Sequence, residues 1–356
     1  MKKLNILLSL LLIILAAFSG CKGESTPQAS TGENDIVNFP GMSEFKCVQY
    51  GDNIYYDHWS GGSYSLTKIP INAQSMAEGE AVLNGAYIIE LSGSHLLLGE
   101  NNDTLVALDL ESGKAKRVEG VRLGTVAADS GCAYYLSSDK ALCRFDLRNG
   151  QAEVLEAGPF SKLKKGDGRL LACSSDFKSL YTFDIQSGTL SEPAAAADGQ
   201  IDFFWEYDGD IYYAASKSED GIGNHDINVI GAGGQSTVIL AGTDVVYDTA
   251  AVAGGSCYIQ YLPKGGQRML AVIDQSGIVS EQPAAGALCN KAQYGDTVLS
   301  WGGQSAKAET ALGEYTFNTG DEICSLYATS DNAVILTYPF SLSIIDLTNG
   351  KTAEIK

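Results

Sequence analysis

The stretch DSGCAYYLSSDKALCRFDLRNGQAEVLE at residues 129–156 contains, in order, a turn, an aromatic strand, a polar hairpin, an apolar strand, an Asp-x-x-Asn-Gly turn and a last short strand. The same order returns in GDGRLLACSSDFKSLYTFDIQSGTLSEP at residues 166–193 and in SDNAVILTYPFSLSIIDLTNGKTAEIK at residues 330–356. Short apolar runs between turn residues are typical of β-strands. Beyond an apolar run at the N-terminus, no helical periodicity of useful length is present, so the chain is predicted to be all-β.

The unit recurs eight times along the chain, counted from the first core residue of its aromatic strand: Ile54, Leu96, Ala133, Leu170, Ile211, Cys257, Val298 and Val334. Successive copies begin 42, 37, 37, 41, 46, 41 and 36 residues apart. A further apolar stretch precedes each aromatic strand, as in DFFWEY at residues 202–207. Four strands in about 40 residues is the size of a β-propeller blade. We therefore expect a β-propeller of eight four-stranded blades, with seven as the alternative because three units lack the complete Asp turn.

Consecutive tyrosines occupy the aromatic strand of three units. A four-stranded blade cannot bury both faces alone, so neighbouring blades must stack face to face. Aromatic side chains suit this packing, because the ring fills the space between blades while its hydroxyl keeps a polar contact. The tyrosines expected between blades are Tyr55, Tyr56, Tyr134, Tyr135, Tyr212 and Tyr213.

An aspartate ends the third strand of four units and stands four residues before a glycine. Its carboxylate can accept hydrogen bonds from the backbone N–H groups of the turn, and the glycine supplies the positive φ that a short hairpin requires. Catalytic carboxylates must instead converge within several ångströms, whereas one aspartate per blade is spread around a ring. We therefore assign a structural turn role to Asp109, Asp146, Asp184 and Asp346.

The N-terminus reads MKKLNILLSLLLIILAAFSGC. Two lysines precede an apolar run of about 15 residues, the layout of a secretory signal and short of the roughly 20 that a membrane-spanning helix needs. The end of this run, Phe-Ser-Gly-Cys, resembles the lipobox at which bacterial lipoproteins are cleaved and lipid-modified. Residues rich in Ser, Thr, Gly and charge follow, a composition typical of a flexible tether. We expect a signal peptide at residues 1–20, lipid on Cys21, a tether at residues 21–40 and the propeller at residues 41–356.

The formal net charge is −19, and removal of Lys2 and Lys3 with the signal takes it to −21. Such a surface repels nucleic acid and anionic head groups, so we expect no nucleic-acid partner and attachment to the membrane through the lipid alone. The chain has 8 Cys, none in Cys-x-x-Cys spacing, and 3 His, so we expect no metal site. Buried free thiols are the favoured state of the cysteines, and Cys132 and Cys143, which flank one hairpin, are the pair best placed for a disulfide.

Motifs for chemistry are sparse. No Gly-x-Ser-x-Gly nucleophile elbow is present, and the Gly-rich GAGGQS at residues 231–236 lacks the following helix that a phosphate site requires. The three histidines lie in different units. We therefore expect no catalytic residue and no cofactor. The stretch SEDGIGNHDIN at residues 218–228 is expected to be a solvated acidic loop, with calcium binding as the alternative; its oxygen ligands would come from Glu219, Asp220, Asn224 and Asp226.

Aromatic residues mark one candidate binding surface. Loops between second and third strands share one face of a propeller with the loops between blades, and unit 1 places DHWSGG there, unit 7 SWGGQS and unit 8 TYPFS. These units become neighbours when the ring closes. Exposed aromatic rings beside glycines can stack on sugars or anchor a peptide; the alternative is that they cap blade edges and are buried. The candidate ligand-binding residues are Trp59, Trp301, Tyr338 and Phe340, with Trp205 in an inner strand facing either the channel or the blade interior.

The units resemble two propeller families over nearly the whole chain after the tether. DGDIYYAAS and GDNIYYD look like the Asp-Gly-x-Ile-Tyr-Tyr repeats of cell-surface bacterial propellers. LVALDLESGK at residues 105–114 looks like the WD40-like repeat of quinoprotein-like propellers, which include an eight-bladed lipoprotein of outer-membrane protein assembly. The tryptophan that docks adjacent blades in those repeats has no counterpart in KAKRVE, QAEVLE or TLSEPA. This departure places the chain nearer the Ile-Tyr-Tyr group and argues against a quinone cofactor.

The sequence thus predicts a monomeric propeller that is anchored by lipid to the extracytoplasmic face of a bacterial cell envelope. Because function resides in sites rather than in folds, two functions stay open, and a convergent pair of carboxylates in the mouth of the channel would distinguish the second from the first. The first is a non-enzymatic scaffold that holds a protein or peptide. The second is a carbohydrate-binding or carbohydrate-active propeller that uses the same aromatic residues.

Overall fold

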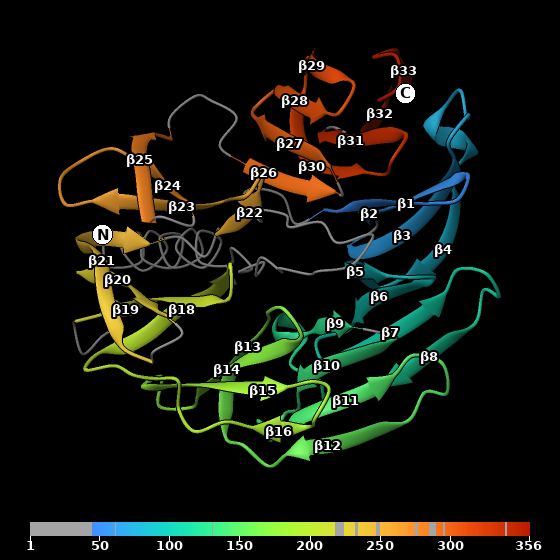
Figure 1. Ribbon diagram of the computed structural model, residues 1–356. Helices are drawn as coiled ribbons and strands as arrows, with labels where there is room; N and C mark the ends of the chain where they lie inside the picture. Colours follow the sequence, from blue (N-terminus) through green and yellow to red (C-terminus); the bar gives the residue numbers. More distant parts are fainter. Residues whose placement is uncertain are drawn as a thin grey trace, which may run out of the picture.

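The computed structural model describes residues 45–60, 62–129, 131–217, 224–231, 234–246, 250–274, 277–284, 290–294, 296–338 and 340–356. Its antiparallel sheets stand side by side in a closed ring (Figure 1). The predictions for residues 1–40, including lipid on Cys21, lie outside the described residues. Within them, no helix is long and apolar enough to cross a membrane.

The first four blades follow one another without strand exchange. Blade 1 contains β1 (Cys47–Tyr50), β2 (Asn53–Ser60), β3 (Ser63–Pro70) and β4 (Glu80–Asn84). Blade 2 contains β5 (Ala86–Ser92), β6 (His95–Glu100), β7 (Thr104–Asp109) and β8 (Ala115–Val118). Blade 3 contains β9 (Ala127–Asp129), β10 (Cys132–Leu136), β11 (Leu142–Asp146) and β12 (Ala152–Glu156). Blade 4 contains β13 (Phe160–Lys165), β14 (Arg169–Ser174), β15 (Ser179–Asp184) and β16 (Thr189–Leu190), with β17 (Ala195–Ala196) also paired to β15. The 3-10 turns η1 (Met76–Glu78) and η2 (Leu123–Thr125) lie in connections.

The second half repeats the arrangement. Blade 5 contains β18 (Gln200–Tyr207), β19 (Asp210–Ser216), β20 (His225–Ile230) and β21 (Ser236–Val246), and blade 6 contains β22 (Ala251–Ala253), β23 (Ser256–Pro263), β24 (Met269–Asp274) and β25 (Gly277–Pro283). Blade 7 contains β26 (Asn290–Tyr294), β27 (Thr297–Gly302), β28 (Ser305–Thr310) and β29 (Gly313–Asn318), and blade 8 contains β30 (Glu322–Ala328), β31 (Asn332–Tyr338), β32 (Ser341–Asp346) and β33 (Thr352–Ile355).

The described strands therefore form the eight predicted four-stranded units in an all-β propeller. The long strand β21 pairs with β20 of its own blade and, through its last residues, with β23 of the next. This joins blades 5 and 6 into one sheet, so the eight units make seven hydrogen-bonded sheets. The eight residues aligned in the sequence all lie on the second strand of their blade.

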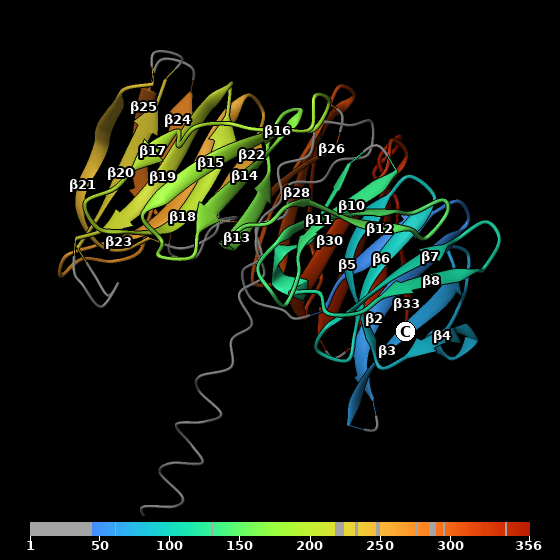
Figure 2. The same cartoon turned by 90° about the horizontal axis from the view of Figure 1, so that it is seen from below.

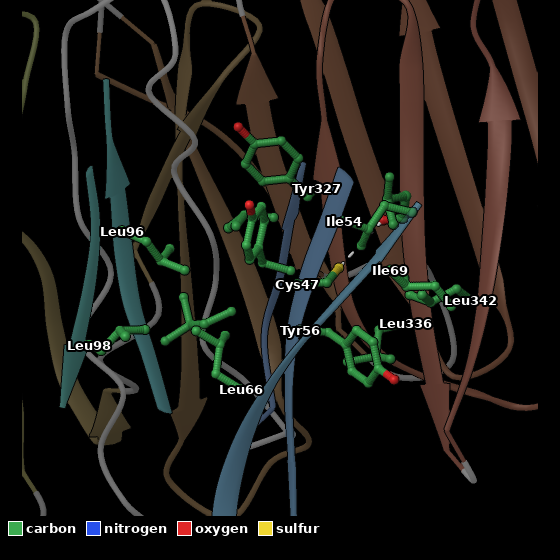
Figure 3. Close-up of a cluster of buried hydrophobic side chains, with 14 of the residues drawn as sticks. Cys47, Ile54, Tyr56, Leu66, Ile69, Leu96, Leu98, Tyr327, Leu336 and Leu342 are labelled. Atoms are coloured by element: carbon green, nitrogen blue, oxygen red, sulfur yellow. Dashed lines mark hydrogen bonds between the residues drawn. The ribbon is translucent and has the colours of Figure 1, made fainter. Parts of the chain in front are cut away.

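Apolar side chains on both faces of the second strands hold the ring together. Consecutive tyrosines point in opposite directions: Tyr134 packs in the cluster shared with blade 4, and Tyr135 packs in the cluster shared with blade 2. The cluster around Cys47, drawn in Figure 3, joins blade 8 to blades 1 and 2, with Tyr327 and Leu336 on one side and Leu96 and Leu98 on the other. Each blade thus completes the core of its neighbours.

The four turn aspartates hold their hairpins through local hydrogen bonds. The Asp146 carboxylate accepts the backbone N–H groups of Arg148 at 2.8 Å and Asn149 at 3.0 Å, and Gly150 follows with φ of 77°. Hydrogen bonds from their own turns also reach Asp109, Asp184 and Asp346. Because these bonds favour the ionised form, they lower the pKa of all four carboxyl groups.

Cys132 and Cys143, the pair best placed for a disulfide in the sequence, are both free thiols, the state that the sequence analysis favoured. In the hairpin, Cys132 pairs with Asp146 and Cys143 pairs with Tyr135. These positions lie three residues apart in register, so the side chains point to opposite faces of the blade. Among the described residues all six cysteines are free, and burial raises the pKa of the Cys47 and Cys257 thiols to about 12.

Packing against Tyr87 makes one glycine sensitive to substitution. Gly99 stands opposite Tyr87 in the β5–β6 ladder, and a Cβ at this position would lie 2.4 Å from the Tyr87 ring. We expect Gly99→Ala to lower the free energy of unfolding by about 1–3 kcal/mol, because overpacking forces the ring to move. Urea denaturation measures this change. Gly124→Ala is the matched control, since its Cβ meets nothing within 4 Å; equal effects of the two substitutions would contradict the prediction.

Candidate functional site: the aromatic rim of blades 8, 1 and 2

Aromatic and imidazole rings form a continuous path where blades 8, 1 and 2 meet. Phe340 lies at its centre, with ring centroids 6.0 Å from Tyr338, 4.9 Å from Phe45 and 5.7 Å from His58. From Phe45 the path continues to Tyr64, with ring centroids 6.1 Å apart. The Tyr64 ring also contacts Trp59 at 5.0 Å and Tyr87 at 5.3 Å. We call this surface the aromatic rim; it consists of Phe45, His58, Trp59, Tyr64, Tyr87, Tyr338 and Phe340.

Ring closure and one long hairpin position these side chains. Strand β1 contacts β30 and β31, so the first and last blades are neighbours. Strands β2 and β3 are each 8 residues long, and their hairpin projects beyond the ring in Figure 2, where it is the blue ribbon with a grey tip. Trp59 lies near the end of this hairpin, and Tyr338 ends β31.

The rim combines exposed rings with a buried base. Trp59 is 52% exposed and Tyr338 is 59% exposed. Phe45 and Phe340 pack against the buried cluster that joins blades 8, 1 and 2. Large exposed aromatic side chains on a rigid base are the usual anchors of protein interfaces, because they lose little conformational entropy on binding.

Two of the candidate tryptophans lie elsewhere. Trp301 is 4% exposed and packs between blades 7 and 8, so the expectation that it joins the rim is wrong. Strand β27 continues through Trp301 to Gly302, which pairs with Ser305, and the residue therefore follows the strand alternation instead of lying in a loop. Trp205 lies in the interior between blades 5 and 6, where its ring stacks on Tyr212 at 6.1 Å.

A buried carboxylate stands directly behind the rim. Asp57 on β2 is 0% exposed, and its two oxygens accept the backbone N–H of Lys46 at 2.5 Å and of Ile88 at 2.6 Å. The ammonium group of Lys46 donates to the carbonyl of Ile89 at 2.9 Å. Burial raises the pKa of Asp57 to about 7 and lowers the pKa of Lys46, against the attraction between the two groups.

His58 follows Asp57 and faces the rim. Burial lowers the pKa of its imidazole, and within the described residues its buried Nδ1 atom has no hydrogen-bond partner. A neutral ring among aromatic neighbours is consistent with both observations. The residues that the sequence analysis did not select are Phe45, Asp57, His58, Tyr64 and Tyr87. One signal was present, namely an acidic residue within the otherwise apolar and aromatic run IYYDHW.

The described carboxylate of the acidic stretch is already paired. In the acidic stretch at residues 218–228, Glu219 and Asp220 lie outside the described residues, while the Asp226 carboxylate bonds Lys217 and the N–H of Gly242. The described residues contain no group of three or more His, Cys, Asp or Glu side chains that could hold a metal ion.

Comparison with known proteins identifies the class of fold. No family model and no curated protein sequence matches the chain. Among proteins of known structure, it is similar to the computationally designed protein Ika8, with a TM-score of 0.55 and 11% identity over 91% of this chain and 100% of the other. BamB from Moraxella catarrhalis gives a TM-score of 0.51 and 13% identity over 84% and 95% of the two chains, and the Dos1 propeller gives 0.53 and 11% over 88% and 94%. At such identities the likeness shows the fold, and the chain is a β-propeller.

Tryptophan fluorescence can test the placement of the rim. The chain has three tryptophans, of which Trp59 is half-exposed while Trp205 and Trp301 are buried. We expect Trp59→Phe to remove most of the emission that acrylamide quenches, whereas Trp301→Phe leaves the quenchable emission in place. In urea denaturation, Trp301→Ala should lose about 3–5 kcal/mol of stability, and Trp59→Ala should stay within about 0.5 kcal/mol of the unaltered chain. A larger loss of stability in Trp59→Ala than in Trp301→Ala would show that Trp59 is not the exposed tryptophan.

Proposed function

We propose that the chain is a lipid-tethered, extracytoplasmic propeller of a bacterial cell envelope that holds a protein or peptide at its aromatic rim, without enzymatic activity. The observation that carries this proposal is the exposure of Trp59 and Tyr338 at 52% and 59% on a path of touching aromatic rings. A contiguous patch of large exposed apolar side chains usually marks a surface that a binding partner covers.

The rim offers an extended partner aromatic anchors from two blades. Trp59 and Tyr338 come from different blades. A path of ring contacts links them, running from Trp59 through Tyr64, Phe45 and Phe340 to Tyr338. Peptide recognition commonly uses a few aromatic anchors with backbone groups between them. The predicted tether, residues 21–40, precedes Phe45 in the sequence, and Phe45 is itself part of the rim. A partner bound there would therefore lie on the side of the propeller from which the chain leads to the predicted lipid.

Cross-linking in the living cell tests the proposed partner class. A photo-cross-linking phenylalanine analogue is placed at position 59, and at position 154 as the control, because Val154 on β12 is also exposed, at 64%, and lies in blade 3. We expect a discrete protein adduct from position 59 that Tyr338→Ala weakens, and no such adduct from position 154. Binding to purified glycans that Trp59→Ala abolishes, with no protein adduct, would instead support the carbohydrate-binding alternative.

Cell fractionation tests the proposed anchor. With the intact chain expressed in a bacterial host, we expect Cys21→Ser to move the protein from the membrane fraction to the soluble extracytoplasmic fraction, because the variant lacks the lipid that we propose as the membrane anchor. Metabolic labelling with a fatty-acid analogue should mark the unaltered chain and not the variant. Cys132→Ser is the control substitution and should leave both results unchanged.

A further inference from the structure

The buried carboxylate of Asp57 touches three chain segments, and each segment carries a ring of the aromatic rim. On its own strand, Asp57 precedes His58. Its Oδ1 atom accepts the N–H of Lys46, which follows Phe45, and its Oδ2 atom accepts the N–H of Ile88, which follows Tyr87. The two bonds are 2.5 and 2.6 Å long; the bond to Ile88 is buried, the bond to Lys46 is partly buried, and the Asp57 side chain itself is 0% exposed.

The Asp57 carboxylate bonds the Lys46 segment where the regular ladder has ended, and the Lys46 ammonium group adds a second link to β5 through the Ile89 carbonyl at 2.9 Å. Strand β1 pairs with β2 only from Cys47 onward, so the chain at Phe45 and Lys46 lies beyond the regular ladder. A further backbone bond, from the Asp57 N–H to the Lys46 carbonyl at 3.0 Å, extends the contact by one residue. Strand β5 belongs to blade 2, and its start is bonded across the interface between blades by the same carboxylate.

We propose that Asp57 is the positioning residue of the aromatic rim, fixing through its carboxylate the backbone segments that carry Phe45, His58 and Tyr87. The geometry of the rim, and not only the stability of the fold, then depends on this group. The effect on ligand affinity rests on the proposed function, but the effect on rim geometry does not.

A comparable carboxylate one interface further along provides contrast. Glu90 on β5 accepts the N–H of Ala128 in blade 3 at 3.1 Å, so it also joins two inner strands. The residues beside Ala128 are Ala127 and Asp129, neither of which belongs to the rim. Bonding between inner strands is thus general to the ring, whereas the attachment of three rim segments to one side chain belongs to Asp57.

The charge state of Asp57 is set by its surroundings. The titratable groups that face it are Lys46 ahead of β1, Cys47 on β1 and Tyr87 on β5, with Glu90 next to Lys46 and His58 adjacent on β2. Burial raises the pKa of Asp57 from 3.8 to about 7. The folded chain therefore takes up a proton near pH 7 that the unfolded chain takes up only near pH 4. This difference in proton binding stabilises the folded chain at acidic pH, and the stabilisation is lost as the pH rises through 7. Protonation also turns one carboxylate oxygen of Asp57 into a hydroxyl that faces one of the two N–H donors. This weakens one of the two hydrogen bonds that position the rim segments.

The decisive experiment compares Asp57→Asn with Glu206→Gln. Both residues are buried carboxylates between blades, and Glu206 pairs with Arg169 at 2.8 Å at the interface of blades 4 and 5. Acrylamide quenching of Trp59 and near-ultraviolet circular dichroism report the rim. We expect both signals to change near pH 7 in the unaltered chain, to be altered and independent of pH in Asp57→Asn, and to retain the step in Glu206→Gln.

His58→Gln separates the two groups that can titrate in this range, and it serves as the second variant where Asp57→Asn does not fold. The step should persist in His58→Gln if Asp57 is its source. Loss of the step in His58→Gln, or quenching and dichroism in Asp57→Asn that match the unaltered chain, would overturn the proposal. If the rim responds as expected while cross-linking at position 59 captures no protein, the proposed function fails and the positioning role stands.

Discussion

Coverage of both faces of every sheet is the constraint on which the structure depends. Each blade carries apolar side chains on both faces of its second strand, as the adjacent Tyr134 and Tyr135 show by entering two different clusters. A sheet of this kind exposes one face if it stands at the end of a row. A closed ring has no end, so closure between blades 8 and 1 buries the last two faces together, in the cluster around Cys47. The arrangement of the rim follows from this closure, because it brings Tyr338 and Phe340 beside Phe45.

Polar contacts across the blade interfaces set how neighbouring blades align. Apolar packing is non-directional, whereas a hydrogen bond between a side chain and a backbone group fixes one strand against the next. Among the described residues every interface has a hydrogen bond of this kind, an ion pair or, between blades 7 and 8, a backbone–backbone hydrogen bond. In ring order they join Ser325 to Cys47, Asp57 to Ile88, Glu90 to Ala128, Asp129 to Lys165, Glu206 to Arg169, Tyr207 to Gly255, Gln293 to Gly254, and Gly303 to Ile323. Asp57 differs from the others in that the segments it joins bear the exposed aromatic surface.

The sequence was most informative where the determinant is local and repeats. Spacing, turn residues and paired tyrosines predicted the eight units and their second strands, because each signal is complete within one blade. The exposure of a single side chain was harder to predict from the sequence. Trp301 and Trp59 both stand near the end of a second strand beside glycines, and both pair in regular register across a short turn. They differ in depth: Trp301 lies three residues past the aligned Val298 and packs against blade 8. The longer strand β2 carries Trp59 five residues past the aligned Ile54, to the projecting end of its hairpin. Contacts between neighbouring blades could not be predicted from the sequence, since nothing local shows that Asp57 bonds Lys46 and Ile88.

The way the ring closes has a mechanical consequence. Blade 1 is made from the start of the described chain and blade 8 from its end, with no strand exchanged between them; the C-terminal carbonyl of Lys356 accepts the N–H of Met76. Strand β1 has a single ladder partner, β2, through four residue pairs. Tension applied through the residues before Phe45 would therefore enter at β1 and act first on the Phe45 and Lys46 contacts, ahead of the interior of the ring. If the proposed anchor and partner exist, a pull on the anchor and occupancy of the rim would oppose one another, and a bound partner would strengthen the segment through which the propeller is held.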